Sequence, residues 1–128
     1  MSNLEEAKEI FGNDIYAAQL TGVQILAAEP GYAKCALEIE DKHKNALGQV
    51  MGGVFFVMAD FAFAIASNFK QPPTVTQTSQ IVYLAPVKGK TLYAETEKYA
   101  RAERPAFTRS RSTTTPARST PTSRPRDL

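Results

Sequence analysis

The sequence contains no tryptophan, a single cysteine (Cys35) and a single histidine (His43). One thiol excludes a disulfide within the chain and a metal site built from several cysteines, and it favours a reducing compartment, here the cytoplasm. One histidine leaves no cluster of metal ligands, so we expect no metal. The first residues are acidic and polar, with no basic segment leading into an apolar one, so no secretory signal is predicted.

Arginine is absent from the first 100 of the 128 residues. Eight lysines accompany eleven acidic residues there, whereas residues 101–128 hold seven arginines and two acidic residues. The formal net charge of +2 therefore combines an acidic domain with a basic tail. A basic patch for nucleic acid would rest on the tail alone. We do not expect a nucleic-acid partner, and an anion-binding arm stays an alternative for the tail only.

No apolar run is long enough to predict a membrane span. The longest covers residues 50–66 and contains one charged residue, Asp60. A span needs about 20 apolar residues, and a carboxylate near its centre costs about 2.5–3.5 kcal/mol. Because the run is apolar on every face, we predict a helix buried on all sides inside the protein and no membrane association.

Hydrophobic periodicity and turn residues predict the elements around this run. A helix over residues 4–11, capped by Asn3 and ended by Gly12, is followed by helical turns over residues 14–20. Strands are expected over residues 23–29, 32–40, 74–85 and 91–99. In the second strand, Cys35 falls on the apolar side of the alternation and is predicted to be a core residue. This order predicts the α+β class, with an antiparallel sheet covering the central helix.

Residues 1–100 are expected to form the domain and residues 101–128 a tail. From Arg101 onward, Phe107 and Leu128 are the only large apolar residues, so burial cannot offset the ordering entropy and disorder is predicted. A displaced reading frame is the alternative. With a one-base shift, residues 109–127 can encode two alternating strands around an Asp/Gly turn. The tail would then be a frameshifted remnant of the last strands, which the sheet otherwise lacks.

A constellation of polar residues and glycines surrounds the start of the central helix. It reads His43-x-Asn45-x-x-Gly48-x-x-Met51-Gly52-Gly53, then Asp60 within the helix, then Thr76-x-x-x-x-Ile-x-Tyr-Leu-x-Pro. This pattern resembles the hotdog-fold thioesterases of the phenylacetic-acid-degradation (PaaI-like) type, which usually have His where this chain has Met51. The resemblance covers residues 13–99. It implies a hotdog fold and hydrolysis of acyl-CoA, with coenzyme A entering only as part of the substrate and no other cofactor. It further implies a homodimer or homotetramer whose sites lie at dimer interfaces.

Three residues are candidates for the chemistry itself. Thioester hydrolysis needs a base or nucleophile, a group that places water and donors for the developing oxyanion. Asp60, desolvated by apolar neighbours one helical turn away, is the candidate base or nucleophile, with a structurally paired buried acid as the alternative. The Gly52 amide at the helix start is the candidate oxyanion donor. The two are about 12 Å apart along a helix, too far to meet on one carbonyl within one chain. Asn45 would orient the water or the thioester oxygen, or else cap the helix.

Four more residues are candidates for substrate binding. Met51 cannot polarise a carbonyl as a histidine would, so hydrolysis is expected to be slower or differently selective. Gly53 either offers an amide or permits close helix–sheet packing. Thr76 matches a hydroxyl residue of some relatives, with an ordinary strand threonine as the alternative, and His43 is a site residue or a loop residue. A non-catalytic hotdog acyl- or CoA-binding protein is the alternative function.

Overall fold

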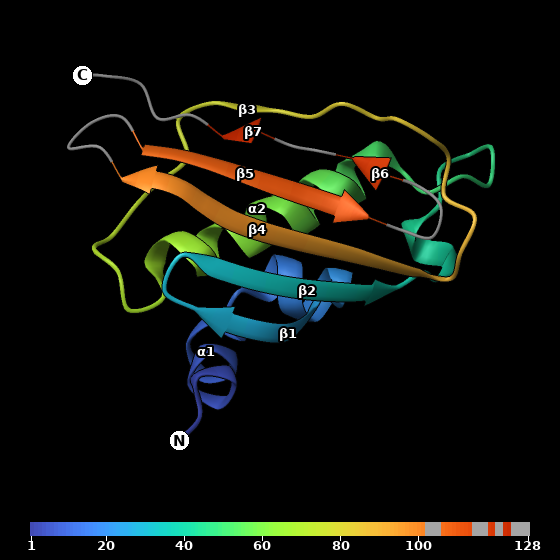
Figure 1. Ribbon diagram of the computed structural model, residues 1–128. Helices are drawn as coiled ribbons and strands as arrows, with labels where there is room; N and C mark the ends of the chain where they lie inside the picture. The colour runs from blue at the N-terminus through green and yellow to red at the C-terminus, as the bar shows by residue number, and fades with distance from the viewer. Residues whose placement is uncertain (102–105, 114–117, 120–121, 124–128) are drawn as a thin grey trace.

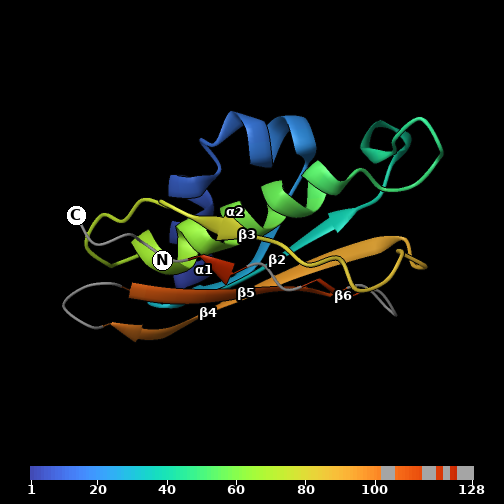
Figure 2. The same cartoon turned by 90° about the horizontal axis from the view of Figure 1, so that it is seen from above.

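The computed structural model describes residues 1–101, 106–113, 118–119 and 122–123, with side chains as far as Glu97. In this part of the chain an antiparallel sheet lies against one long helix, α2 (Gly52–Asn68), as Figure 1 shows. Seen from above in Figure 2, α2 and the short helix η1 (Ile15–Thr21) lie on the same side of the sheet. The predicted α+β class is confirmed.

The N-terminal residues form α1 (Asn3–Phe11) and η1, where helices were predicted. The capping residue of α1 is Ser2 and not Asn3, because the Ser2 hydroxyl accepts the Glu5 N–H at 3.2 Å. The predicted end at Gly12 is confirmed. Asp14 caps η1, a π-helix, and Gly22 ends it in the left-handed conformation (φ 90°) that glycine adopts without strain.

Four long antiparallel strands form the main part of the sheet. They are β1 (Gln24–Glu29), β2 (Tyr32–Glu38), β4 (Thr91–Arg101) and β5 (Ala106–Thr113), and they lie in the order β1-β2-β4-β5. Short strands continue the sheet beyond β5: β7 (Thr122–Ser123) and then β3 (Ser79–Gln80) follow in that order, and β6 (Arg118–Ser119) also pairs with β5. In β2, Cys35 and Leu37 are buried as predicted and Lys34 is not, but Ala36 between them is buried too, so the alternation holds only in part. The strand ends at residue 38, two residues before the predicted end. On β4, within residues 91–97, the buried residues are Leu92, Ala94 and Thr96.

Helix α2 supplies the other half of the core. Phe61, Met58 and Ile65 are fully buried and join Leu37 and Leu92 of the sheet in one hydrophobic cluster. Burial of each such large side chain contributes about 1.5–3 kcal/mol. The turn between β1 and β2 is attached to the end of the helix, because the N–H of residue 31 donates to the carbonyl of residue 66 at 2.9 Å.

One face of α2 remains uncovered, which corrects the prediction that the helix is buried on all sides. Gly53, Phe56 and Asp60 recur at helical spacing and are exposed, and Val57 and Ala64 beside them are partly buried. The sheet can cover only one side of a helix, and η1 shields only a part of the remainder. An apolar face of a central helix is therefore accessible in the single chain.

The segment between α2 and β4 forms much less strand than predicted. Of residues 74–85, only β3 (Ser79–Gln80) is a strand, and it pairs with β7 (Thr122–Ser123). A strand needs a backbone partner along its length, and the described residues of β7 provide two paired positions. The rest of the segment runs extended past α2 (Figure 2).

The structure departs from the expected disorder of residues 101–128 where it describes them. Residues 106–113 form β5, which pairs with β4 from Tyr93 to Arg101, and β6 (Arg118–Ser119) and β7 pair with β5. The expectation of disorder rests on the burial of apolar side chains alone. It leaves out the backbone hydrogen bonds that β5 makes with β4. The remainder of the predicted tail lies outside the described residues.

Candidate active site

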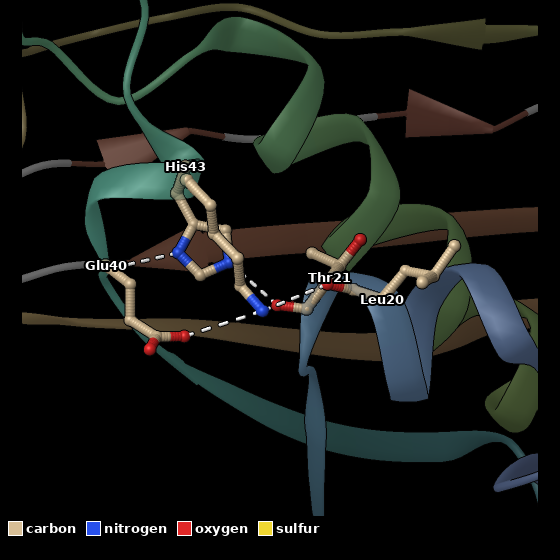
Figure 3. A network of polar contacts seen from close by, with 5 residues as sticks. Leu20, Thr21, Glu40 and His43 are labelled. Atoms are coloured by element: carbon tan, nitrogen blue, oxygen red, sulfur yellow. Dashed lines mark hydrogen bonds and ion pairs between the residues drawn. The ribbon is translucent and has the colours of Figure 1, made fainter.

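The loop that leads into α2 is anchored by His43, at the end of the short helix η2 (Asp41–His43). The imidazole is 3% exposed. Its Nδ1 accepts the N–H of Glu40 at 2.9 Å, and its Nε2 lies 2.7 Å from the carbonyl oxygen of Thr21, as Figure 3 shows. Because an N–H can only donate, the ring proton is on Nε2 and is donated to Thr21. Both ring nitrogens of this candidate substrate-binding residue are thus occupied within the protein.

The backbone of His43 also fixes the residue that precedes the helix. Its carbonyl accepts the Met51 N–H at 2.9 Å, which closes the loop of residues 43–51 at its base. Within this loop the Asn45 side-chain oxygen accepts the N–H groups of Leu47 (2.9 Å) and Gln49 (3.1 Å). Asn45 therefore organises the loop and does not cap α2. Because the Oδ1 of Asn45 already accepts these two N–H groups, its Nδ2 is the atom that would contact a ligand.

Helix α2 begins without a capping side chain. Met51 is the N-cap residue and makes no side-chain hydrogen bond there, while its carbonyl accepts the Val54 N–H at 3.0 Å. The N–H groups of Gly52 and Gly53 belong to the first turn, where an α-helix has no internal acceptors and its dipole is positive. A Cβ on Gly53 would meet only the Met51 Cε, at 3.7 Å, and Gly53 is exposed. Close helix–sheet packing therefore does not explain this glycine.

Gly52 is in close contact with a side chain from the segment after β3. The Tyr83 hydroxyl donates to the Gly52 carbonyl at 2.9 Å, and the Tyr83 ring packs edge-on against Phe55, with centroids 5.5 Å apart. A Cβ added to Gly52 would lie 2.9 Å from the same hydroxyl oxygen. Only glycine fits at this position without displacing the tyrosine.

Two cavities open on either side of the helix start. One, of about 450 Å³, is lined by Gln49, Val50, Gly52, Phe55, Tyr83 and neighbours in residues 84–87. The other, of about 310 Å³, is lined by Tyr16, Leu20, Thr21, Lys42, His43, Met51, Gly53, Val54 and Val57. The second cavity thus brings together three of the four residues predicted to bind substrate. Both walls are mainly apolar, as expected for a pocket that takes a small organic group.

Asp60 lies on the uncovered face of α2, two turns along from the glycines. Partial burial raises the pKa of its carboxyl above the ordinary value of 3.8, and the charge of Asp14 raises it further. Asp14 is held in place because its Oδ1 accepts the Ala17 N–H at 2.9 Å as the cap of η1. The side chain is more exposed than the sequence led us to expect, and neither cavity includes it.

A single chain does not unite all the candidate residues. Thr76 is exposed and, like Asp60 and Asn45, lines neither cavity, whereas Gly52 lines one cavity and Met51, Gly53 and His43 line the other. Sequence reasoning missed two contributors. The motif Thr-x-x-x-x-Ile-x-Tyr-Leu-x-Pro contains Tyr83, but it gives no sign of the bond that Tyr83 makes with Gly52. No sequence pattern connects Asp14 with Asp60, because only the fold brings η1 beside α2.

The described residues contain no group of three or more His, Cys, Asp or Glu side chains placed to hold a metal ion. No helix among the same residues is long and apolar enough to cross a membrane.

The sequence is similar to esterases and thioesterases. It is 31% identical over 96 residues to a protein of Archaeoglobus fulgidus named "Putative esterase", covering 74% of this chain and 62% of that protein. It is 28% identical over 68 residues to human acyl-coenzyme A thioesterase 13, covering 52% of this chain and 49% of the relative. The chain thus spans about half to three fifths of the length of these relatives. No protein-family model matches the chain.

Solved structures of thioesterases share the fold. Thioesterase superfamily member 2 from Mus musculus superposes with a TM-score of 0.83 at 20% identity, over 97% of this chain and 96% of that one. A mutant of the phenylacetic acid degradation protein PaaI from Thermus thermophilus gives 0.76 at 26% identity, over 84% and 94%. A thioesterase-like protein from Streptococcus pneumoniae, solved with coenzyme A, gives 0.79 at 18%, over 91% and 93%.

The chain is therefore a hotdog-fold protein, with an antiparallel sheet against a central apolar helix. The resemblance to the hotdog-fold thioesterases of the PaaI-like type, first indicated by the residues around Met51, is confirmed.

Proposed function

We propose that this protein hydrolyses acyl-CoA-type thioesters at a site shared between two copies of the chain. The observation that carries the proposal is Asp60, a lone carboxylate with a raised pKa on an otherwise apolar, uncovered helix face. A carboxylate in such a setting is a stronger base than one in water. The thioesterase relatives, and the neighbour solved with coenzyme A, favour a thioester of coenzyme A as the substrate.

A second copy completes the proposed site. Gly52 and Asp60 are eight residues apart, about 12 Å along the helix axis, so one chain cannot bring both to one thioester carbonyl. The face that holds Asp60 also exposes Phe56, which is 38% exposed although large and apolar. Pairing two such faces would bury both aromatic rings and place the Asp60 carboxylate of one copy near the helix start of the other.

In the proposed reaction, Asp60 takes a proton from a water molecule that attacks the thioester carbon; the carbon–sulfur bond then breaks, the carboxylic acid forms, and the proton on Asp60 passes to the leaving thiolate. Alternatively, Asp60 attacks that carbon itself and the carbon–sulfur bond breaks, so that the acyl group is held on Asp60 as an anhydride and the thiolate takes a proton from solvent. Water then hydrolyses the anhydride, which releases the carboxylic acid and restores the carboxylate. The Gly52 N–H of the other copy would donate to the developing oxyanion, where the positive end of the helix dipole adds stabilisation. Asn45 would hold the water or the thioester oxygen through Nδ2.

The remaining candidates would contact the substrate without taking part in proton transfer. Met51, Gly53 and His43 line the cavity of about 310 Å³, and the Met51 side chain adds an apolar surface at its mouth. Thr76 would reach the substrate only if the second copy approaches the segment between α2 and β4. We expect the cytoplasm as the location, a homodimer or homotetramer as the assembly, and no cofactor.

The test compares Asp60→Asn with wild type on a panel of acyl-CoA thioesters, with thiol release as the measurement. We expect at least a hundredfold loss of kcat, because general-base catalysis contributes about 10²–10⁴. Glu38→Gln, which changes an exposed acid on the sheet, is the matched control. Unchanged turnover in Asp60→Asn would remove the proposal. If wild type binds coenzyme A but hydrolyses no thioester, the non-catalytic alternative is favoured. Met51 supports that alternative because, unlike a histidine, its side chain cannot polarise a carbonyl.

The shared site has a separate test in the assembly. Phe56→Glu places a charge on the uncovered face of α2 and is expected to give monomers in light scattering together with loss of hydrolysis. A wild-type chain that is monomeric and still turns over thioesters would show that one chain contains the whole site.

We also propose that residues 109–127 are read from a displaced frame. Ser112 pairs with Ser119 and Thr113 with Arg118, so β5 and β6 are antiparallel, as the two strands of a hairpin are. In the displaced reading, the Asp/Gly turn falls on residues 114–117, which lie outside the described residues. Sequencing the source DNA tests this: a second frame that encodes the alternating hairpin is expected, and its absence would refute the idea.

A further inference from the structure

Tyr83 holds the first turn of α2 from outside the helix. Its hydroxyl donates to the Gly52 carbonyl at 2.9 Å, and its ring contacts the Phe55 ring at 82°, so the phenol is fixed at two points of the same turn. Gly52 is the first residue of α2, whereas Tyr83 lies 31 residues further along the chain, in the segment that follows the helix. Tyr83 therefore provides a tertiary contact at a helix start that has no capping side chain of its own.

This contact restrains two consecutive glycines. Glycine has more backbone freedom than any other residue, and two in the first turn of a helix leave that turn free to fray. The peptide unit before Gly52 is held at the Met51 carbonyl, which accepts the Val54 N–H at 3.0 Å. The peptide unit after Gly52 is held at the Gly52 carbonyl by Tyr83. Since a peptide unit is planar, fixing each carbonyl also fixes the direction of the N–H opposite it.

We propose that Tyr83 is a positioning residue that orients the Gly52 and Gly53 amides for an anionic oxygen. The proposal rests on the function proposed above, because in that function the two amides bind the developing oxyanion of the thioester. Tyr83 acts through the Gly52 carbonyl and exchanges no proton with the substrate. Partial burial raises the pKa of the Tyr83 hydroxyl, so at neutral pH it keeps the proton that it donates.

The same geometry explains why position 52 is glycine. A Cβ there would lie 2.9 Å from the Tyr83 hydroxyl oxygen and 3.4 Å from the ring carbon that bears it. The first distance is too short for non-bonded atoms, whereas the second is near ordinary contact. Removing the hydroxyl alone would therefore make room for alanine. At Gly53 the nearest atom is the Met51 Cε at 3.7 Å, so Tyr83 does not limit that position.

The experiment is a set of variants in which positions 52 and 83 are changed separately and together. Tyr83→Phe is expected to lower kcat by about three- to tenfold with KM changed less than twofold, the effect of losing one neutral hydrogen bond. Gly52→Ala is expected to lower both Tm and kcat more than Tyr83→Phe does. The double variant Gly52→Ala/Tyr83→Phe is expected to regain the Tm and kcat of Tyr83→Phe. Tyr93→Phe, on the sheet, is the control for loss of a phenol hydroxyl, and no change is expected.

Two outcomes would overturn the proposal. In the first, the loss of Tm and kcat in Gly52→Ala persists when Tyr83→Phe is added. In the second, Tyr83→Phe restores Gly53→Ala as well as it restores Gly52→Ala, which the distances exclude because Tyr83 is not among the atoms near a Cβ on Gly53. If wild type hydrolyses no thioester, the proposed function fails, but the positioning is still tested by amide NMR. Tyr83→Phe is expected to shift the Gly52 and Gly53 amide resonances and Tyr93→Phe is not. Unmoved resonances would count against the proposal.

Discussion

The ring of His43 joins the entrance of helix α2 to the end of η1 through one short hydrogen bond, 2.7 Å from its Nε2 to the Thr21 carbonyl oxygen. The two residues are 22 positions apart; the ring is buried, and the bond itself is partly buried. Since the His43 carbonyl also receives the Met51 N–H, one residue sets the position of the segment from which the candidate oxyanion donors begin.

His43→Ala is expected to destabilise the fold by about 2–4 kcal/mol. Truncation removes a buried ring and leaves the partly buried Glu40 N–H and Thr21 carbonyl without their partner, and an unsatisfied group costs about 1–3 kcal/mol when it is buried. The free energy of unfolding from urea titration measures the change. Lys42→Ala, which removes an exposed side chain from the same short helix, is expected to cost less than about 1 kcal/mol. A loss in His43→Ala no larger than in Lys42→Ala would show that the ring does not anchor the loop.

Local rules predicted much of this fold. The alternation around Cys35 identified β2, because a period of two reflects a strand with one buried side, and the length of the apolar run identified α2. Local rules failed where pairing with a strand distant in sequence determines whether a segment forms a strand. The segment around Thr76 has strand composition but a strand partner at only two described positions, and β5 has tail composition yet pairs with β4.

The candidate site was predictable in its residue types and not in its geometry. The glycines at the helix start and the lone Asp60 stood out in the sequence. The contact of Tyr83 with Gly52 and the charge of Asp14 near Asp60 depend on segments that only tertiary packing brings together.

Cys35 is expected to be unreactive toward thiol reagents in the folded protein. Its side chain is fully buried, and burial raises the pKa of the thiol to about 12. At pH 8 only about one thiol in ten thousand would be ionised, and the thiolate is the reactive form. Labelling with a chromogenic disulfide in increasing urea should follow the unfolding transition. Complete labelling within seconds in the absence of urea would contradict the buried position.

Asp60→Asn is expected to stabilise the folded protein at neutral pH. The pKa of Asp60 lies above 3.8 in the folded state, so the folded state binds this proton more tightly than the unfolded state does. Stability therefore falls as pH rises from 3.8 through the folded-state pKa, and the whole penalty is present above it. Asparagine cannot ionise, so the gain should be present at pH 7 and disappear as the pH falls below 3.8. Urea titrations of both proteins across this range measure it, and a gain that does not depend on pH would contradict the assignment.

Asp14→Asn is expected to move the acid limb of the pH–rate profile to lower pH. Hydrolysis needs ionised Asp60, so kcat/KM should fall as pH decreases through the raised pKa of that carboxyl. The charge of Asp14 contributes to the rise, and asparagine removes the charge while keeping the oxygen that caps η1 through the Ala17 N–H. Burial of Asp60 is unchanged, so the limb should remain above 3.8. Asp41→Asn, which neutralises an exposed acid on η2, is the control and should leave the limb in place. An acid limb that stays fixed in Asp14→Asn would mean that a group other than Asp60 titrates in the reaction.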